Sequence, residues 1–506
     1  MLPARCWQWT AATRLGDDAA CKRGDAVRGG DGADLRAQLI RRKPVATLMD
    51  DAGPHRGGLR RALGALDLTA LGIGAIIGAG IFVMTGVGAR EAGPGLIVSF
   101  ILAGLACAMA ALCYAEFAAM IPAAGSAYSY SYATMGELVG WIIGWDLVLE
   151  YAVGAAAVAV GWSGYFRVIL EGMGLHLPHA IAFAPGTEPG AVVNLPALLI
   201  VLLISAVLYV GIRESARLNS IIVAIKLCAV AVVILVGMFF VRPQNWTPFA
   251  PFGWSGISKG AAYIFFAYIG FDAVSTAAEE VVDPGRDLPR GILWSLFVCT
   301  FLYIAVAAVL TGMVPYNEID KNAPLASAFV VRGMNFIGGV ISIGAVMGLT
   351  SVLLVLLLGQ SRIFFAISRD GLLPRAFSRV HPRFLTPYIP TVITGAAVGI
   401  AAALLPIQEI AELTNIGTLF AFVLVCLGVW ILRYINPDQH RPFRTPFVPL
   451  VPIVGALSCL YLMGSLPIVT WIRFFVWMAI GLAIYFSYGR YHSHVDAAAC
   501  ARAAAD

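Results

Sequence analysis

The sequence predicts an all-α integral membrane protein, and two observations lead to this class. Of the 506 residues, 59% are hydrophobic and only 12% are charged, and the mean hydropathy is +0.83. Soluble domains carry about twice that share of charge. Apolar runs of about 20 residues, long enough to cross a bilayer as helices, also recur along the whole chain.

Hydropathy and the positions of glycine, proline and charge predict twelve spans. They cover residues 66–88, 95–119, 136–166, 193–212, 217–241, 257–281, 290–314, 334–362, 386–406, 411–433, 447–468 and 470–489. With the N-terminus inside, the inner loops hold twelve Arg residues and the outer side holds seven Lys or Arg residues. Because basic residues stay on the cytoplasmic side, both termini are expected in the cytoplasm.

The spans suggest an organisation into a transport core and two tails. Residues 1–60 are expected to be a cytoplasmic tail, of which 1–32 lack periodicity and are disordered or follow a start codon called too early. Residues 61–434 should hold the first ten spans and 435–490 the last two. Residues 491–506 should form a cytoplasmic C-terminal tail.

Composition also excludes several functions. The net charge of +5 is small and dispersed, so a nucleic-acid partner is not expected. The nine cysteines have no metal-ligand spacing, and the seven histidines lie outside the predicted spans. No nucleophile–base pattern or nucleotide loop stands out. We therefore expect no enzyme activity, no cofactor and no metal.

Two spans are interrupted in a similar way. The first contains GIGAIIGAGIF (72–82) with four glycines, and the sixth contains FFAYIGFD (265–272). Glycine weakens a helix and lets a ligand approach the backbone, although small residues also serve close helix packing. Interrupted helices at corresponding places in two halves of a chain indicate a transporter's binding site.

A lone charge marks the fifth span. Lys226 is the only charged residue of the apolar run 221–241. An intramembrane ionisable residue indicates a functional site, and burial lets a lysine take up and release a proton near neutral pH. The alternative is a lysine that extends to an interface or pairs structurally, because it lies about one turn into the span.

Five stretches together resemble one family. They are GALDLTALGIGAIIGAGIFVMTG (64–86), YAEFAAMIPAAGSAYSYSYATMGE (114–137), RLNSIIVAIKL (217–227), FFAYIGFDAVSTAAEEVVDPGRDLPRGI (265–292) and GQSRIFFAISRDGLLP (359–374). The chain resembles the amino acid–polyamine–organocation superfamily, and within it the bacterial permeases of the cationic amino acid transporter group. The resemblance implies a leucine-transporter-like fold with two inverted five-helix repeats plus two helices. It also implies secondary active transport of L-amino acids, usually coupled to protons.

The resemblance further implies a binding site at the two interruptions. The substrate carboxylate should meet the N–H groups of Ala79 and Gly80, next to Gly78, because a half-helix begins there. The substrate ammonium should meet backbone carbonyls. Those carbonyls belong to Ile76, Phe266, Ala267 and Ile269. Relatives often carry Thr where this chain has Ala79, which removes a hydroxyl contact and keeps the backbone ones.

The substrate side chain should face the eighth span, where residues 349–358 include no acid. Three of them share one face by their spacing, namely Leu349, Val352 and Leu356. This favours small neutral or apolar amino acids. Asp146 and Glu150 in the third span could instead serve a basic substrate, although structural pairing or placement near an interface is the favoured interpretation.

Lys226 aligns with the lysine that proton-coupled members carry where sodium-coupled relatives hold sodium. We expect its protonated form to bond to a first-span carbonyl near Gly74 and to Thr350 or Ser351, so that deprotonation releases the first span. Phe266 and Glu116 are candidate gates. A simple cap or loop salt bridge is an equal alternative for Glu116.

The predicted protein is therefore a proton symporter that imports L-amino acids by alternating access across the inner membrane of a bacterium. An exchanger, a carrier of cationic amino acids and a membrane sensor that does not transport remain alternatives. Its expected partners are the amino acid, protons and the lipid bilayer. The sequence does not identify a small membrane partner subunit.

Overall fold

The computed structural model describes residues 38–42, 63–121, 126–211, 216–276, 278, 281–384, 386–435 and 437–493. The segment predicted to be disordered and most of both predicted tails lie outside these ranges. Apart from an isolated bridge between Leu63 and Val281, the described residues form helices, turns and loops. Within them, seven helical stretches are long and apolar enough to cross a membrane, and four shorter apolar helices accompany them.

Each predicted span coincides with one helix or one interrupted helix. In the first half these are α4 (Ala65–Ile76) with η2 (Gly80–Met84) and α5 (Thr85–Ala92), α6 (Leu96–Met120), α8 (Glu137–Gly172), α10 (Leu195–Val210) and α11 (Ala216–Gly237). In the second half they are α12 (Gly253–Ile264) with η6 (Phe265–Tyr268) and α13 (Ala273–Thr276), α14 (Pro284–Met313), α16 (Asn335–Arg369), α17 (Tyr388–Leu404) and α18 (Ile407–Ile435). The last two are α19 (Leu450–Gly464) and α20 (Ile468–Ile484).

Short helices connect the long ones. They are η3 (Gly93–Gly95), α7 (Ser126–Thr134), α9 (His179–Ala182), η4 (Met238–Phe240), η5 (Pro243–Trp246), α15 (Pro324–Val330), η8 (Arg375–Ser378), η9 (Tyr485–Gly489) and α21 (Arg490–His492). Three long helices extend beyond the predicted spans. The predicted spans end at the first charged residue, whereas the helical backbone continues past it. The helix α8 continues past Arg167, α14 begins before Arg290, and α16 continues past Arg362. Arginine is a good helix former, so these ends persist.

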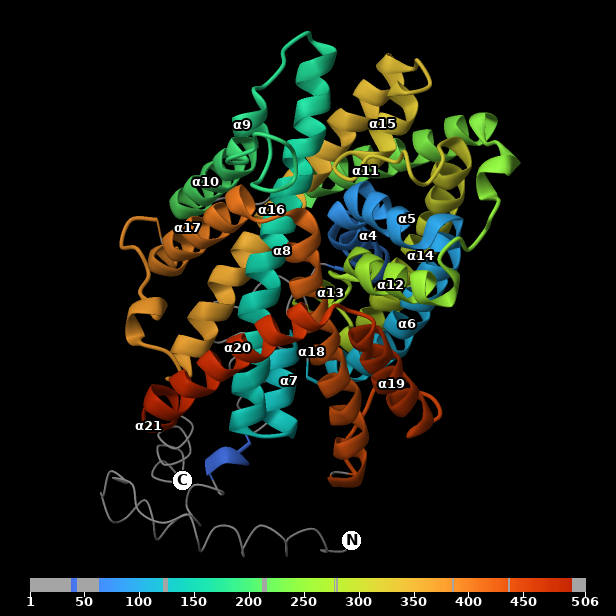
Figure 1. Ribbon diagram of the computed structural model, residues 1–506. Helices are drawn as coiled ribbons and strands as arrows, with labels where there is room; N and C mark the ends of the chain where they lie inside the picture. Colours follow the sequence, from blue (N-terminus) through green and yellow to red (C-terminus); the bar gives the residue numbers. More distant parts are fainter. Residues whose placement is uncertain are drawn as a thin grey trace, which may run out of the picture.

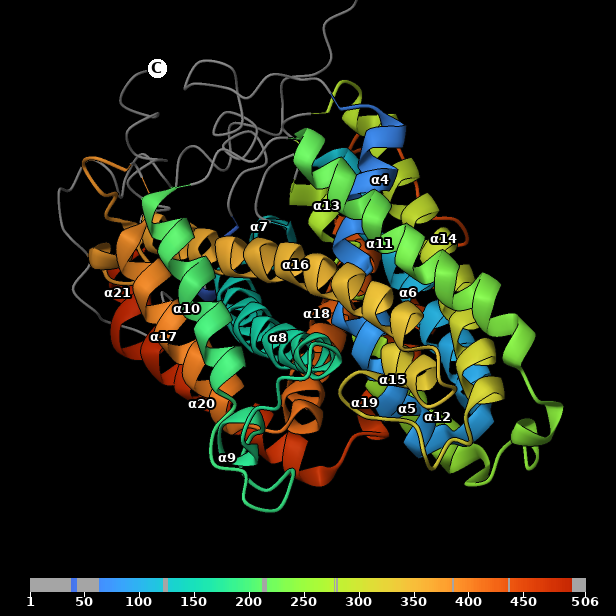
Figure 2. The ribbon, with the colours of Figure 1, turned by 90° about the horizontal axis from the view of Figure 1, so that it is seen from above.

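The helices form two groups on either side of α18 (Figures 1 and 2). One group contains α8, α10, α16 and α17, with α16 packed along α8 and α10 packed along α17. The other contains α4, α5, α6, α12 and α14, with α14 packed on both α4 and α6. The interrupted helices belong to the second group, and their breaks face α8 and α16 of the first.

Tryptophan contacts attach the last helix to the first group. The indole N–H groups of Trp145 and Trp477 each donate to the other residue's carbonyl, at 2.9 and 3.1 Å. Their rings stack with centroids 4.5 Å apart, and Trp145 also covers Gly481. Buried indole N–H groups need such partners, so these bonds fix α20 against α8. The outward faces of the helices carry exposed apolar side chains, for example Leu199 and Phe301, as expected of a protein surrounded by lipid.

Candidate functional site

The first interrupted helix breaks directly after Ile76. The backbone of Ile77 is extended, with φ −73° and ψ 99°, and η2 begins at Gly80. The Ile77 N–H still bonds to the Ile73 carbonyl, while the Phe82 N–H bonds to the Gly78 carbonyl. The helical hydrogen bonds therefore stop and restart across residues 77–79, which confirms the break that the glycines predict.

The second interrupted helix breaks after Tyr268. Ile269 is extended, with φ −60° and ψ 135°, and α13 begins at Ala273. Between them Gly270 has φ +113°, a conformation that L side chains rarely adopt. A β-carbon added there would also lie 2.9 Å from the Ala75 carbonyl oxygen. Glycine is therefore needed at this position for both conformation and space.

The two breaks touch each other through their backbones. A β-carbon added at Gly80 would lie 2.1 Å from the Cα and 2.6 Å from the Cβ of Ala267. Together with the approach of Gly270 to Ala75, this contact holds the half-helix ends of both spans side by side. Gly80 therefore serves close packing between helices, which was the alternative interpretation of the first-span glycines. At Gly78, by contrast, an added β-carbon would meet the tip of the Val352 side chain at 3.1 Å.

A tyrosine that the sequence analysis missed joins the two breaks. The fully buried hydroxyl of Tyr303 on α14 lies 2.9 Å from the carbonyl oxygens of both Ile76 and Ala267. Its single proton is therefore shared between two of the carbonyls expected to receive the ammonium. The signal was available, since a phenol within an apolar span must find a polar partner.

Replacing Tyr303 with phenylalanine should remove the shared donor from both carbonyls. We expect a loss of about 1–3 kcal/mol in the free energy of unfolding, because buried carbonyls lose a partner. Thermal unfolding in detergent and substrate titration would measure stability and affinity. Tyr268→Phe is the matched control, since its hydroxyl donates to Phe100, away from the breaks. Equal losses in both variants would contradict the special role of Tyr303.

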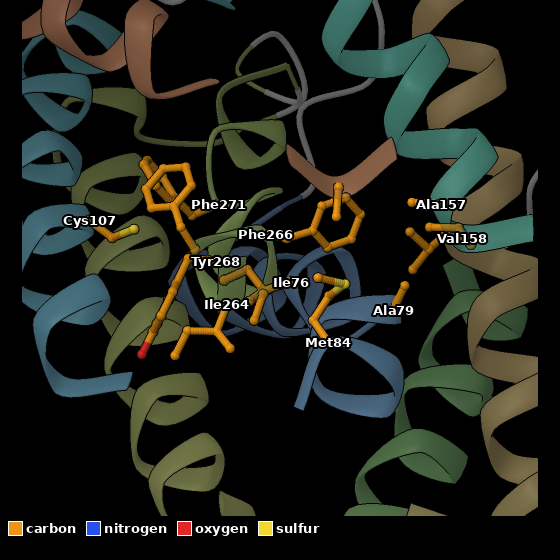
Figure 3. Packing of buried hydrophobic residues seen from close by; sticks show 14 of the residues in the cluster. Ile76, Ala79, Met84, Cys107, Ala157, Val158, Ile264, Phe266, Tyr268 and Phe271 are labelled. Carbon is orange, nitrogen blue, oxygen red and sulfur yellow. The ribbon is translucent and has the colours of Figure 1, made fainter. Parts of the chain in front are cut away.

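Phe266 lies beside both breaks. Its side chain is 6% exposed, and Figure 3 shows the ring between Ile76 and Met84 on one side and Ala157 and Val158 of α8 on the other. It thus lies over the junction where a candidate gate was expected. Ile269, whose carbonyl is also predicted to accept from the ammonium, is half-buried.

The eighth-span face predicted to receive the side chain is apolar and turned inward. Leu349 is fully buried, Val352 is 9% exposed and lies against Gly78, and Leu356 is half-buried. The Leu356 side chain approaches Gly154 of α8, where an added β-carbon would lie 3.8 Å from its Cδ1. The wall between the first break and α8 is therefore made of aliphatic groups.

Lys226 lies within the helix bundle, with 1% of its surface exposed. Its Nζ donates to the Gly74 carbonyl of α4 at 2.8 Å, two residues before that helix ends. The alternative in which the side chain extends to an interface is therefore wrong. Its aliphatic carbons lie over Gly348 of α16, where an added β-carbon would be 2.9 Å from the Lys226 Cγ. Lys226 thus contacts α4 and α16 from α11.

The expected bonds from Lys226 to Thr350 or Ser351 are not found among the described residues. The Thr350 hydroxyl donates to the Val346 carbonyl and accepts from the Trp162 indole, at 2.7 and 2.9 Å. The Ser351 hydroxyl donates to the Gly348 carbonyl at 2.9 Å. Helical hydroxyls commonly donate back to their own preceding turn, as both do here, and the Lys226 ammonium donates to the Gly74 carbonyl. Lys226 contacts α16 through carbon atoms instead.

Glu116 forms an ion-pair cluster at one end of the bundle. It is 2% exposed and accepts two bonds from the Arg433 guanidinium, at 2.9 and 2.8 Å. The Arg441 Nε lies 3.2 Å away, and the Thr445 N–H donates to the carboxylate at 2.7 Å. These contacts join the end of α6 to the end of α18 and the segment after it. The geometry matches the salt-bridge alternative for Glu116.

Glu116→Gln should destabilise the fold by about 3 kcal/mol, because it leaves two guanidinium groups at a buried site without their counter-charge. Thermal unfolding of the purified protein measures the loss. Glu409→Gln is the control, since the pair of Glu409 with Arg473 is about 40% exposed and such pairs contribute little. An equal effect of the two substitutions would contradict the structural role of Glu116.

Asp146 and Glu150 are also placed by the structure. Both are buried on α8, at 0% and 4% exposure, and no described cation forms an ion pair with either. Structural ion pairing, part of the favoured interpretation from sequence, is therefore wrong for this pair within the described part of the chain. Burial of Asp146 without a hydrogen-bond partner among the described residues needs another explanation, which is developed below.

Known proteins identify the family. The model of the amino acid permease family matches residues 63–486. The chain is 51% identical over 458 residues to the methylthioribose transporter of Bacillus subtilis (strain 168), covering 90% of this chain and 99% of that protein. It is 50% identical over 465 residues to the branched-chain amino acid permease BcaP of the same organism, covering 91% and 100%. It is 32% identical over 591 residues to human cationic amino acid transporter 4, covering 91% of each chain.

The match covers both interrupted helices, Lys226 and every long helix described above. Members of this family are transporters and not enzymes, as the sequence predicted. The chain is a multi-pass membrane protein of the amino acid permease family.

Proposed function

We propose that the protein imports small apolar L-amino acids, branched-chain ones foremost, by proton symport with alternating access. The observation that carries this proposal is the backbone contact of the two helix breaks beside an aliphatic wall. In the proposed arrangement, spans one to five and six to ten form inverted repeats in residues 61–434, followed by two helices in 435–490. The proposed location is the cytoplasmic membrane of a bacterium, with both termini inside.

The breaks supply what a zwitterion needs without any charged side chain. A half-helix begins at Ala79 and Gly80, where free N–H groups and the positive end of the helix dipole favour a carboxylate. The carbonyls of Ile76 and Ala267 lie next to it and can accept from an ammonium, since each oxygen has a second lone pair beyond its bond to Tyr303. Both charged groups of an amino acid can thus be bound at one junction.

The wall next to the breaks favours an aliphatic side chain. Leu349, Val352 and Leu356 provide carbon atoms only, and α16 contains no acidic residue that could pair with a cationic substrate. Apolar burial contributes about 0.8 kcal/mol per methylene, so branched side chains gain more than alanine. The 50% identity to a branched-chain permease supports the same substrate class.

Proton coupling is proposed to act through Lys226. When protonated, it donates to the Gly74 carbonyl and ties α4 to α11 close to the first break. A buried ammonium is stable only while it is well hydrogen-bonded. The positive charge of Lys226 and its bond to Gly74 are therefore expected to form and to be lost together. Loss of the proton weakens the tie and frees α4 to move with the break.

Uptake of radiolabelled L-leucine into proteoliposomes under an imposed inward proton gradient tests the proposal. Accumulation that valine, isoleucine and alanine block, and that arginine does not, is expected. Methylthioribose is included as a competitor because a relative with 51% identity carries that name. It has neither an ammonium nor a carboxylate for the breaks to bind, so weak competition is expected.

Three results would overturn parts of the proposal. Inhibition by arginine and lysine alone would make the protein a carrier of cationic amino acids. Exchange against internal amino acid without gradient-driven uptake would make it an exchanger. Binding without either flux would make it a sensor.

A further inference from the structure

The Asp146 carboxyl is buried without a partner in the middle of α8. None of its surface is exposed, and neither oxygen has a hydrogen-bond partner among the described residues. It faces α18, where a β-carbon added at Gly417 would lie 2.8 Å from its Oδ1. Glycine at this position lets the α18 backbone cover the carboxyl and keep it from water.

An ionised carboxylate cannot be stable in such a place. Moving a carboxylate into an apolar interior without a counter-charge costs several kcal/mol even after relaxation, and the group takes up a proton instead. Two other buried carboxylates show the contrast. Glu116 pairs with arginines, and Glu412 accepts from the hydroxyls of Tyr263 and Thr470 at 2.6 and 2.7 Å.

The groups around Asp146 include no described cation that would offset its burial. Glu150 lies one turn along the same helix, beside Thr418 of α18, and its charged neighbours are Asp146 and Asp272. The other titratable groups near this stretch are Tyr151 on α8 and Tyr114 on α6. Like charges disfavour ionisation. No group of three His, Cys, Asp or Glu among the described residues could hold a metal ion, which makes a proton the fitting ligand.

We propose that Asp146 is a second proton-binding site of this protein, separate from Lys226. It holds a proton while Gly417 of α18 is packed on it. It gives that proton to water when the contact between α8 and α18 opens. Its position lets it couple protonation to that contact, whereas Lys226 couples protonation to the contact of α4 with α11. This extends the proposed proton symport with a second group.

Infrared spectroscopy of the purified full-length protein tests this site without any transport assay. A protonated carboxylic acid has a carbonyl stretch that ionised carboxylates lack. We expect this band at neutral pH in the wild type and in Glu409→Gln, and the loss of its Asp146 component in Asp146→Asn. The amide of Asn has nearly the same shape as a neutral Asp, so the variant should fold. Gly417→Ala should shift the band, because the added methyl presses on the carboxyl.

The outcomes separate this site from the proposed symport. Retention of the full band in Asp146→Asn, or loss of that component in Glu150→Gln alone, would overturn the assignment to Asp146. If Asp146→Asn does not fold, an unshifted band in Gly417→Ala would overturn it instead. Loss of the component in Asp146→Asn, combined with wild-type uptake that ignores the proton gradient, would keep the proton site and reject symport.

Discussion

Lys226→Ala is expected to abolish gradient-driven accumulation of substrate while the protein remains folded. The substitution removes the proton-carrying group together with its hydrogen bond to Gly74. A bond of this charged type contributes about 1.5–3 kcal/mol, which corresponds to roughly a tenfold to hundredfold change in the equilibrium that holds α4 against α11. The internal concentration of substrate should therefore no longer exceed the external one, whatever proton gradient is imposed.

The measurement compares two fluxes in the same proteoliposomes. Accumulation under an inward proton gradient should be lost in Lys226→Ala, whereas counterflow exchange, which needs no gradient, should persist. Lys259→Ala is the matched control, because Lys259 is exposed on α12 and its loss should change neither flux. Full gradient-driven accumulation by Lys226→Ala would show that the proton is carried elsewhere, with Asp146 as the first group to examine.

The spans and their interruptions were predictable because they depend on local chemistry. Bilayer thickness sets the length of an apolar run, and the glycines around Gly78 and Gly270 set the places where helical bonds fail. The helix-one end of the Lys226 bond was also expected, because the family resemblance places this lysine where sodium-coupled relatives hold sodium.

The parts that could not be predicted depend on how distant helices meet. The two carbonyls bonded by Tyr303 come from helices that are separated by nearly two hundred residues, and no sequence spacing shows that they adjoin. Thr350 was expected to accept a bond from Lys226, but its oxygen accepts from the Trp162 indole of a distant helix. Asp146 lacks a hydrogen-bond partner because of the side chains that pack around it in three dimensions. Its neighbours in sequence do not show this.

Gly80→Ala is expected to weaken substrate binding at least about tenfold, and it tests the central contact of the site. The added methyl would lie 2.1 Å from the Ala267 Cα, a backbone atom that cannot turn away, so the two breaks must separate. Overpacking of this kind costs about 1–3 kcal/mol, and the displacement falls on the groups proposed to bind both ends of the substrate. We expect affinity for leucine to fall at least about tenfold, as measured by scintillation proximity binding.

Two glycine variants give this test its controls. Gly78→Ala places its methyl 3.1 Å from a Val352 methyl, which belongs to a side chain that can adjust, so a smaller loss is expected. Gly339→Ala on α16 meets nothing within 4 Å and should leave binding unchanged, with stability raised by up to about 1 kcal/mol through helix propensity. Equal affinities in Gly80→Ala and Gly339→Ala would mean that the substrate is bound away from the breaks. We expect the loss of affinity to increase from Gly339→Ala to Gly78→Ala to Gly80→Ala. This order follows how rigid the atom is that each new methyl meets, with the backbone of Ala267 as the most rigid.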